Sequence, residues 1–122
     1  MTEEERWPGE WMRGALSLCV LGVVADGPTY GYAITARLAD AGLGVVKGGT
    51  LYPILTRLEA EGLLSSAWSA GEGGPGRKFF TLTRAGHLAL AERSEQWHVF
   101  TRRAAGLLPI PTTTEESRWS TP

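Results

Sequence analysis

The segment GTLYPILTRLEA, residues 49–60, carries apolar side chains at the spacing of one helix face. The apolar positions recur at steps of three and four residues: Leu51, Ile54, Leu55 and Leu58. We expect Thr50 to be the N-cap and Gly62 to end the helix, which places Pro53 at the third helical position, where no N–H is needed. The opposite, exposed face then holds small, polar and aromatic residues: Gly49, Thr50, Tyr52, Pro53, Thr56 and Arg57.

Two more helices are predicted before this segment. The first begins at Glu10 and stops before Asp26-Gly27-Pro28, and one helical stripe carries its apolar residues: Trp11, Ala15, Leu18, Leu21, Gly22 and Ala25. Thr29 can cap a second helix of about 11 residues, ended by Gly42 and Gly44. The buried stripe of this second helix is Tyr30, Ile34, Leu38 and Ala41.

After residue 62 the periodicity changes. Residues 63–68 and 78–82 favour strands, and the glycine-rich residues 69–76 between them predict a two-stranded hairpin with a flexible tip. Thr83 is the expected N-cap of a helix of about 25 residues, roughly 38 Å long, that runs to residue 108. Its apolar stripe is Leu90, Trp97, Phe100, Ala104, Leu107 and Leu108.

The long last helix has no partner of equal length in so small a core, except the first helix. We therefore expect its stripe to pack against the same helix of a second subunit in a homodimer. The order helix, helix, turn, helix, hairpin is that of the winged helix-turn-helix, so the fold class is mainly α with a small β-hairpin. The expected domains are a flexible tail (1–9), a winged helix-turn-helix (10–83), a dimerisation helix (84–108) and a second flexible tail (109–122).

Composition excludes several classes of protein. The chain of 122 residues suits one domain, and its longest apolar run, residues 18–25, is far below the roughly 20 residues of a membrane span, so we expect a cytoplasmic protein without membrane contact. Cys19 is the single cysteine and is expected to be buried, while His87 and His98 lack metal-ligand spacing. No metal, no cofactor and no catalytic arrangement are predicted, and we expect no enzyme.

Three segments closely resemble the PadR-like family of transcriptional regulators: YGY at residues 30–32, GTLYPILTRLE at 49–59 with GLL at 62–64, and RKFFTLT at 77–83 followed by Gly86. The resemblance implies a dimeric repressor that binds a pseudo-palindromic operator, with half-sites roughly 34 Å apart. The candidate contacts to double-stranded operator DNA lie on the exposed face of residues 49–57, on the preceding helix and at basic positions nearby. They are Tyr32, Thr35, Lys47, Gly49, Thr50, Tyr52, Pro53, Thr56, Arg57, Arg77 and Lys78.

The short members of this family include sensors of planar drugs or toxic aromatic compounds, held in a pore at the dimer centre. Trp97 stands where similar multidrug-sensing regulators carry the tryptophans that sandwich such a ligand. The predicted site for a planar aromatic effector is therefore Trp97, Trp11, Met12, Ala15 and Phe100. The alternative for Trp97 is an ordinary core position, and a two-fold axis near it is compatible with both.

Two alternatives concern the function. Residues 71–76 satisfy G-x-G-x-x-G, but they open a strand rather than the helix that a dinucleotide site requires, so we interpret them as a wing tip. A winged-helix module that binds ligands or proteins without sequence-specific DNA binding is the second hypothesis, and the salt dependence of binding separates the two. The whole chain has a formal charge of −1, whereas residues 47–84 hold five basic and three acidic residues, which predicts few phosphate contacts per subunit.

Overall fold

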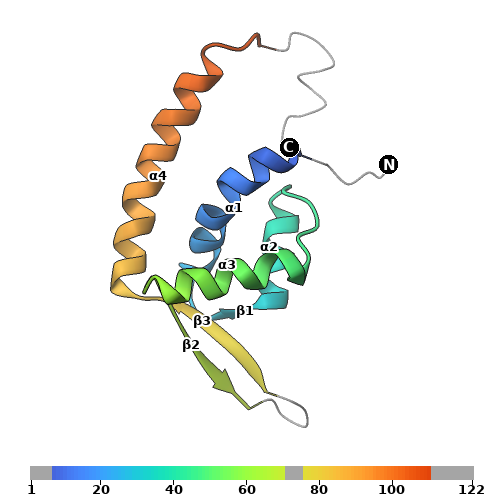
Figure 1. The fold of residues 1–122 in the computed structure, drawn as a ribbon, viewed down its shortest axis with the longest axis vertical. Helices are drawn as coiled ribbons and strands as arrows, with labels where there is room; N and C mark the ends of the chain where they lie inside the picture. Colours follow the sequence, from blue (N-terminus) through green and yellow to red (C-terminus); the bar gives the residue numbers. More distant parts are fainter. Residues whose placement is uncertain (1–6, 71–75, 111–122) are drawn as a thin grey trace.

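The structure is a computed structural model that describes residues 7–70 and 76–110 (Figure 1). Its elements in chain order are α1 (Gly9–Val24), β1 (Thr29–Tyr30), α2 (Gly31–Asp40), α3 (Gly48–Ala60), β2 (Leu64–Ser69), β3 (Arg77–Leu82) and α4 (Arg84–Ala105). The predicted fold class, mainly α with a hairpin in the winged helix-turn-helix order, is confirmed. Most of the predicted tails and hairpin tip lies outside the described residues, at 1–6, 71–75 and 111–122. Gly9, predicted in the first tail, begins α1, and Ser69, predicted in the tip, ends β2.

α1 is the central element, packed against α2 on one side and α4 on the other (Figure 1). The buried core combines side chains from the helices and the sheet: Leu16, Val20, Leu21, Val24, Ile34, Leu38, Val46, Leu51, Leu55, Leu58, Leu63, Leu64 and Phe80. Of the stripe predicted for α1, only Leu21 is buried, and Trp11 is 59% exposed. The prediction was wrong because this helix is apolar on two faces, of which the core covers one and α4 the other.

The turns after α2 and α3 follow the predicted glycines. Gly42 has a φ of 90° and Gly62 a φ of 81°, in the left-handed region that side chains with a Cβ rarely adopt. The next N–H after each glycine reaches back five residues, from Leu43 to the carbonyl of Leu38 (3.1 Å) and from Leu63 to that of Leu58 (3.0 Å). These hydrogen bonds satisfy carbonyls that each helix end leaves open, so both helices stop there.

The predicted starts of α2 and α3 are wrong. Thr29 belongs to β1 rather than capping α2, and Tyr30 is the N-cap. α3 begins at Gly48 with Lys47 as N-cap, because the carbonyl of Lys47 accepts hydrogen bonds from the N–H groups of Thr50 and Leu51, both at 2.9 Å. Pro53 is thus the sixth helical residue and withholds one hydrogen bond inside the helix.

The sheet has three strands, in the order β1-β3-β2, instead of the predicted two. β1 pairs antiparallel with β3, Thr29 opposite Phe80 and Tyr30 opposite Phe79. A two-residue strand carries no alternation that sequence reasoning can detect. β1 connects the start of α2 to the base of the β2–β3 hairpin, which projects beyond α3 as the wing (Figure 1).

α4 begins at the predicted N-cap. The Thr83 hydroxyl accepts a hydrogen bond from the Gly86 N–H (3.0 Å) and donates one to the Gly62 carbonyl (2.6 Å). The helix ends at Ala105, so Leu107 and Leu108 lie beyond it and not on its last turn as predicted. Within the described residues no helix is long and apolar enough to cross a membrane.

Candidate nucleic-acid interface

α3 presents one face to the core and the other to solvent. Leu51, Leu55 and Leu58 are buried, whereas every residue predicted for the opposite face is exposed: Gly49, Thr50, Tyr52, Pro53, Thr56 and Arg57. The sequence pattern therefore assigned the sides of this helix correctly, although it misplaced the first turn. The exposed side has a proline and a glycine, which leave the backbone open to close approach, beside hydroxyl groups that can donate hydrogen bonds.

Tyr52 has a second role that the sequence did not predict. A Cβ built on Gly31 would lie 2.7 Å from Cζ of the Tyr52 ring and would overlap its hydroxyl. The ring of Tyr52 thus rests on the first residue of α2 while remaining 50% exposed. Tyr52 and Gly31 fix the approach of the two helices, and their occurrence in the YGY and GTLYP motifs is the signal that could have indicated this contact.

Arg57 points across the molecule rather than straight outward. Its guanidinium donates a hydrogen bond to the hydroxyl of Ser17 on α1, and its Nε lies 3.7 Å from a carboxylate oxygen of Glu61. The side chain remains half exposed. Two groups of the same chain therefore hold the guanidinium of Arg57, and its exposed part remains open to solvent.

The predicted contacts before α3 lie on α2 and in the turn. Tyr32 is 77% exposed at the start of α2. Thr35 is half-buried, and its hydroxyl donates to the Tyr32 carbonyl at 2.8 Å. Lys47 is exposed directly before α3. These three side chains therefore lie on the helix-turn-helix, with Thr35 the least accessible of them.

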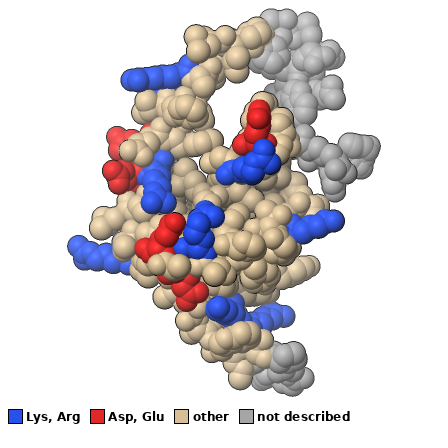
Figure 2. All heavy atoms as spheres, in the orientation of Figure 1, with Lys and Arg blue, Asp and Glu red and all other residues tan. Residues whose placement is uncertain are grey.

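The wing carries the two basic residues predicted for it, and both already have partners. Arg77 lies over the Tyr30 ring, 4.4 Å from its centroid. The Lys78 Nζ lies 3.9 Å from a Glu59 carboxylate oxygen and 5.7 Å from the Phe80 ring centroid. Figure 2 shows this mixture, with acidic side chains among the basic ones near α3 and the wing. The positive charge of the predicted interface is therefore partly neutralised within the chain.

Sequence reasoning missed two residues beside this surface. Glu59 accepts a hydrogen bond from the Ser66 hydroxyl at 2.7 Å as well as pairing with Lys78, so it connects α3 to both wing strands. Trp68 on β2 is 72% exposed. The alternation of β2 could have indicated that Trp68 and Ser66 share one face.

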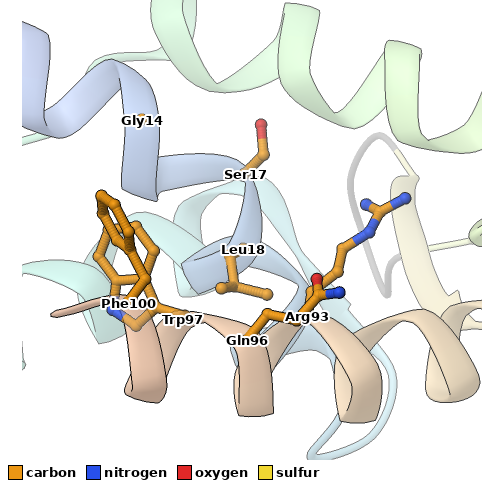
Figure 3. A pocket seen from close by; sticks show the side chains of 7 residues that line it. All are labelled: Gly14, Ser17, Leu18, Arg93, Gln96, Trp97 and Phe100. Carbon is orange, nitrogen blue, oxygen red and sulfur yellow. The ribbon is translucent and has the colours of Figure 1, made fainter. Parts of the chain in front are cut away.

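A hollow of about 360 Å³ lies between α1 and α4 (Figure 3). It is lined by Gly14, Ser17, Leu18, Arg93, Gln96, Trp97 and Phe100. Trp97 and Phe100 lie together, with ring centroids 6.0 Å apart. The Ser17 hydroxyl at its edge points toward α3, where it meets Arg57.

Three of the residues predicted for an effector site do not line this hollow. Trp11 stacks against Trp7 with ring centroids 6.5 Å apart, and Met12 packs against the core. Ala15 is half-buried on a neighbouring part of α1. The structure brings Trp97 and Phe100 together with residues 14, 17 and 18 instead, because a different face of α1 is turned toward α4.

Cys19 is half-buried and packs against the core. Burial raises the pKa of its thiol, which keeps it protonated at neutral pH. Among the described residues no group of three or more His, Cys, Asp or Glu side chains could hold a metal ion.

The sequence of this chain is similar to those of known proteins. Residues 20–92 match the transcriptional regulator PadR-like family. The transcriptional regulator Rv3488 of Mycobacterium tuberculosis is 37% identical over 97 residues, which cover 80% of this chain and 89% of that protein.

Solved structures agree with the sequence matches. A PadR family transcriptional regulator from Eggerthella lenta has a TM-score of 0.74 and 40% sequence identity, covering 84% of this chain and 88% of its own. Bacillus subtilis PadR, crystallised in complex with operator DNA, has a TM-score of 0.59 and 26% identity, covering 64% of this chain and 44% of its own.

Proposed function

This chain belongs to the PadR-like family of transcriptional regulators, and from that premise we propose that it represses transcription by binding operator DNA as a homodimer. The observation that carries the proposal is the exposed side of α3, where small and hydroxyl-bearing residues lie beside a basic wing. A helix of this kind fits the major groove, and the wing lies along the adjacent backbone. A regulator of this type acts in the cytoplasm, where the operator lies.

The exposed side of α3 suits direct contact with base edges. Gly49 and Pro53 add little bulk, so the helix backbone can come close to the groove floor. Thr56 and Tyr52 carry the donors, and Lys47 supplies a phosphate contact at the start of the helix. Because few basic side chains are free, affinity depends on having two copies of this surface.

The second copy comes from pairing through α4. Phe100 is 63% exposed, and Leu107 and Leu108 beyond the helix end are 87% and 64% exposed. Trp97 is half-buried on the same helix. A two-fold partner that covers these apolar side chains removes them from water and sets the distance between the two α3 helices.

The hollow beside Trp97 is where we place the effector. A planar aromatic compound can stack on the Trp97 indole, with Arg93 and Gln96 available for its polar groups. Ser17 lines the same hollow and accepts the hydrogen bond of Arg57 from α3. A ligand that binds more tightly to the form in which the α3 helices no longer match the operator spacing releases the DNA.

The DNA claim is tested by fluorescence anisotropy with a duplex from the promoter next to the protein's own coding sequence. Thr56→Glu places a negative charge on the exposed side of α3 and is expected to weaken binding at least about a hundredfold through phosphate repulsion. Ala91→Glu adds the same charge at an exposed position of α4 and is the matched control. Equal affinity of wild type and Thr56→Glu would show that α3 is not the reading helix.

The effector claim is tested by titrating a planar aromatic dye into the protein–DNA complex. Wild type is expected to bind the dye and release DNA. Trp97→Ala is expected to lose the response to the dye, measured as dye binding to the free protein because Trp97 also belongs to the proposed pairing surface of α4. A response that is unchanged in Trp97→Ala would remove the hollow from consideration as the effector site.

A further inference from the structure

Trp68 lies next to the outer end of β2, and nothing among the described residues covers it: 72% of the side chain is exposed. Single exposed apolar residues are common on proteins, so exposure alone assigns no role. The position of Trp68 relative to α3 is more informative.

Trp68 shares a sheet face with residues that contact α3. Side chains alternate along a strand, so Leu64, Ser66 and Trp68 point to one side of β2. Leu64 is buried in the core, and the Ser66 hydroxyl donates to the Glu59 carboxylate of α3 at 2.7 Å. Trp68 is therefore the next residue outward on the face that α3 covers.

The residue opposite Trp68 on the neighbouring strand also contacts α3. Trp68 stands opposite Lys78 on β3, and the Lys78 Nζ lies 3.9 Å from Glu59. Glu59 follows Thr56 by three residues on α3, so the two are neighbours along that helix. Glu59 and Lys78 thus connect the side of α3 that carries Thr56 to Trp68, and Figure 1 shows the β2–β3 hairpin extending away from α3.

We propose that Trp68 is a further DNA-contact residue, whose indole packs on the deoxyribose of the backbone beside the half-site and whose N–H donates to a phosphate. This rests on the proposed function. DNA is the occupant that the neighbours favour, because Lys78 stands directly opposite the indole on the same sheet face, and this face continues to the exposed side of α3. An indole has both the apolar face for a sugar and the donor for a phosphate oxygen.

The test is an anisotropy titration of the full chain with its promoter duplex at several salt concentrations. Trp68→Ala is expected to bind about tenfold more weakly, the scale of an aromatic contact to nucleic acid. The slope of log affinity against log salt should stay that of wild type, because no charge is lost, whereas Lys78→Ala should lower it. Trp68→Phe, which keeps an aromatic face, should retain most of the affinity.

Leu88→Ala is the matched control for loss of an exposed apolar side chain. Leu88 is 62% exposed and lies two residues before Leu90, on the other side of α4 from the predicted dimer stripe. Its affinity for the duplex should equal that of wild type. Tryptophan fluorescence tests the same contact independently. The emission should shift on DNA binding in wild type and not in Trp68→Phe.

Three results would overturn the inference, and they differ in what else they affect. If wild type binds and Trp68→Ala binds equally well, the wing contact is wrong and the proposed function stands. If wild type does not bind its promoter, the proposed function fails and the contact with it. If Trp68→Ala changes the monomer–dimer equilibrium in sedimentation and not the affinity of the dimer for DNA, the indole is a protein contact.

Discussion

Gly86 lies where the first turn of α4 passes the segment that joins α3 to β2. A Cβ at this position would overlap the carbonyl oxygen of Leu63 and lie 3.1 Å from the carbonyl carbon. That oxygen also accepts a hydrogen bond from the Thr83 N–H at 3.1 Å, so it is not free to move away. The glycine is therefore required by close packing of two backbones.

Gly86→Ala is expected to lower the free energy of unfolding by about 2 kcal/mol, measured by urea denaturation, because the added methyl group forces α4 away from Leu63. Gly22→Ala is the control: nothing lies within 4 Å of a Cβ there, and the substitution should not lower stability, because alanine is the better helix former in the last turn of α1. Equal stability of Gly86→Ala and wild type would contradict the packing.

Glu61, the C-cap residue of α3, is the acidic partner of Arg57, with a carboxylate oxygen 3.7 Å from the Arg57 Nε. Glu61→Gln removes one negative charge beside the candidate interface, so the positive charge of Arg57 is no longer neutralised by a carboxylate, while its hydrogen bond to Ser17 stays. We expect DNA affinity to rise about two- to fivefold at low salt and less at high salt, since both groups are half exposed and screened.

Glu92→Gln, which makes the same charge change at an exposed position of α4, is the control for Glu61→Gln. Anisotropy titrations at two salt concentrations compare the two variants. A gain of equal size in both would mean that net charge, rather than the Arg57 partner, sets the affinity.

At the scale of elements, α4 shows how local chemistry fixes the start of a helix. Thr83 is predictable from its residue type and from the helical pattern after it, and the structure confirms it as the N-cap. The starts of α2 and α3 were not predictable in the same way, because Tyr30 and Lys47 cap with backbone geometry alone and without a side-chain hydrogen bond. A residue type that normally caps, such as Thr29 or Thr50, is then misleading.

Thr83→Ala is expected to cost about 1–2 kcal/mol of stability, because it leaves the Gly86 N–H and the Gly62 carbonyl without their partner. Thr83→Ser keeps the hydroxyl and should lose only a fraction of this. The free energy of unfolding of both variants is measured by denaturant titration. If Thr83→Ser were as unstable as Thr83→Ala, the methyl group of Thr83 rather than its hydrogen bonds would account for the stability.

At the scale of the whole molecule, the order of elements was predictable and the faces of α1 were not. The run of residues 18–25 is apolar on every side, so periodicity could not decide which residues face the core and which face α4. The same uncertainty put Trp11, Met12 and Ala15 in the predicted effector site, whereas residues 14, 17 and 18 are the residues of α1 that line the hollow beside Trp97. Trp97 and Phe100 were placed correctly beside one another because a single helix carries both.

Pairing of two chains is expected to depend on the exposed stripe of α4. Phe100→Glu puts a charge on a side chain that is 63% exposed in the single chain, so the fold should persist. Pairing through α4 would then bury a carboxylate against the partner's apolar surface, which disfavours the dimer. Light scattering after size-exclusion chromatography should give a dimer for wild type and a monomer for the variant, with equal helical circular dichroism. A variant that remains dimeric would place the interface elsewhere.

Hydroxyl-radical footprinting of the wild-type protein on its own promoter tests most directly whether two copies of α3 read one operator. We predict two protected segments related by a two-fold axis, with centres about one helical turn, roughly 34 Å, apart. Thr56→Glu should leave both segments unprotected at the same protein concentration. A single protected segment, or protection that Thr56→Glu leaves unchanged, would contradict a dimer that binds DNA through α3.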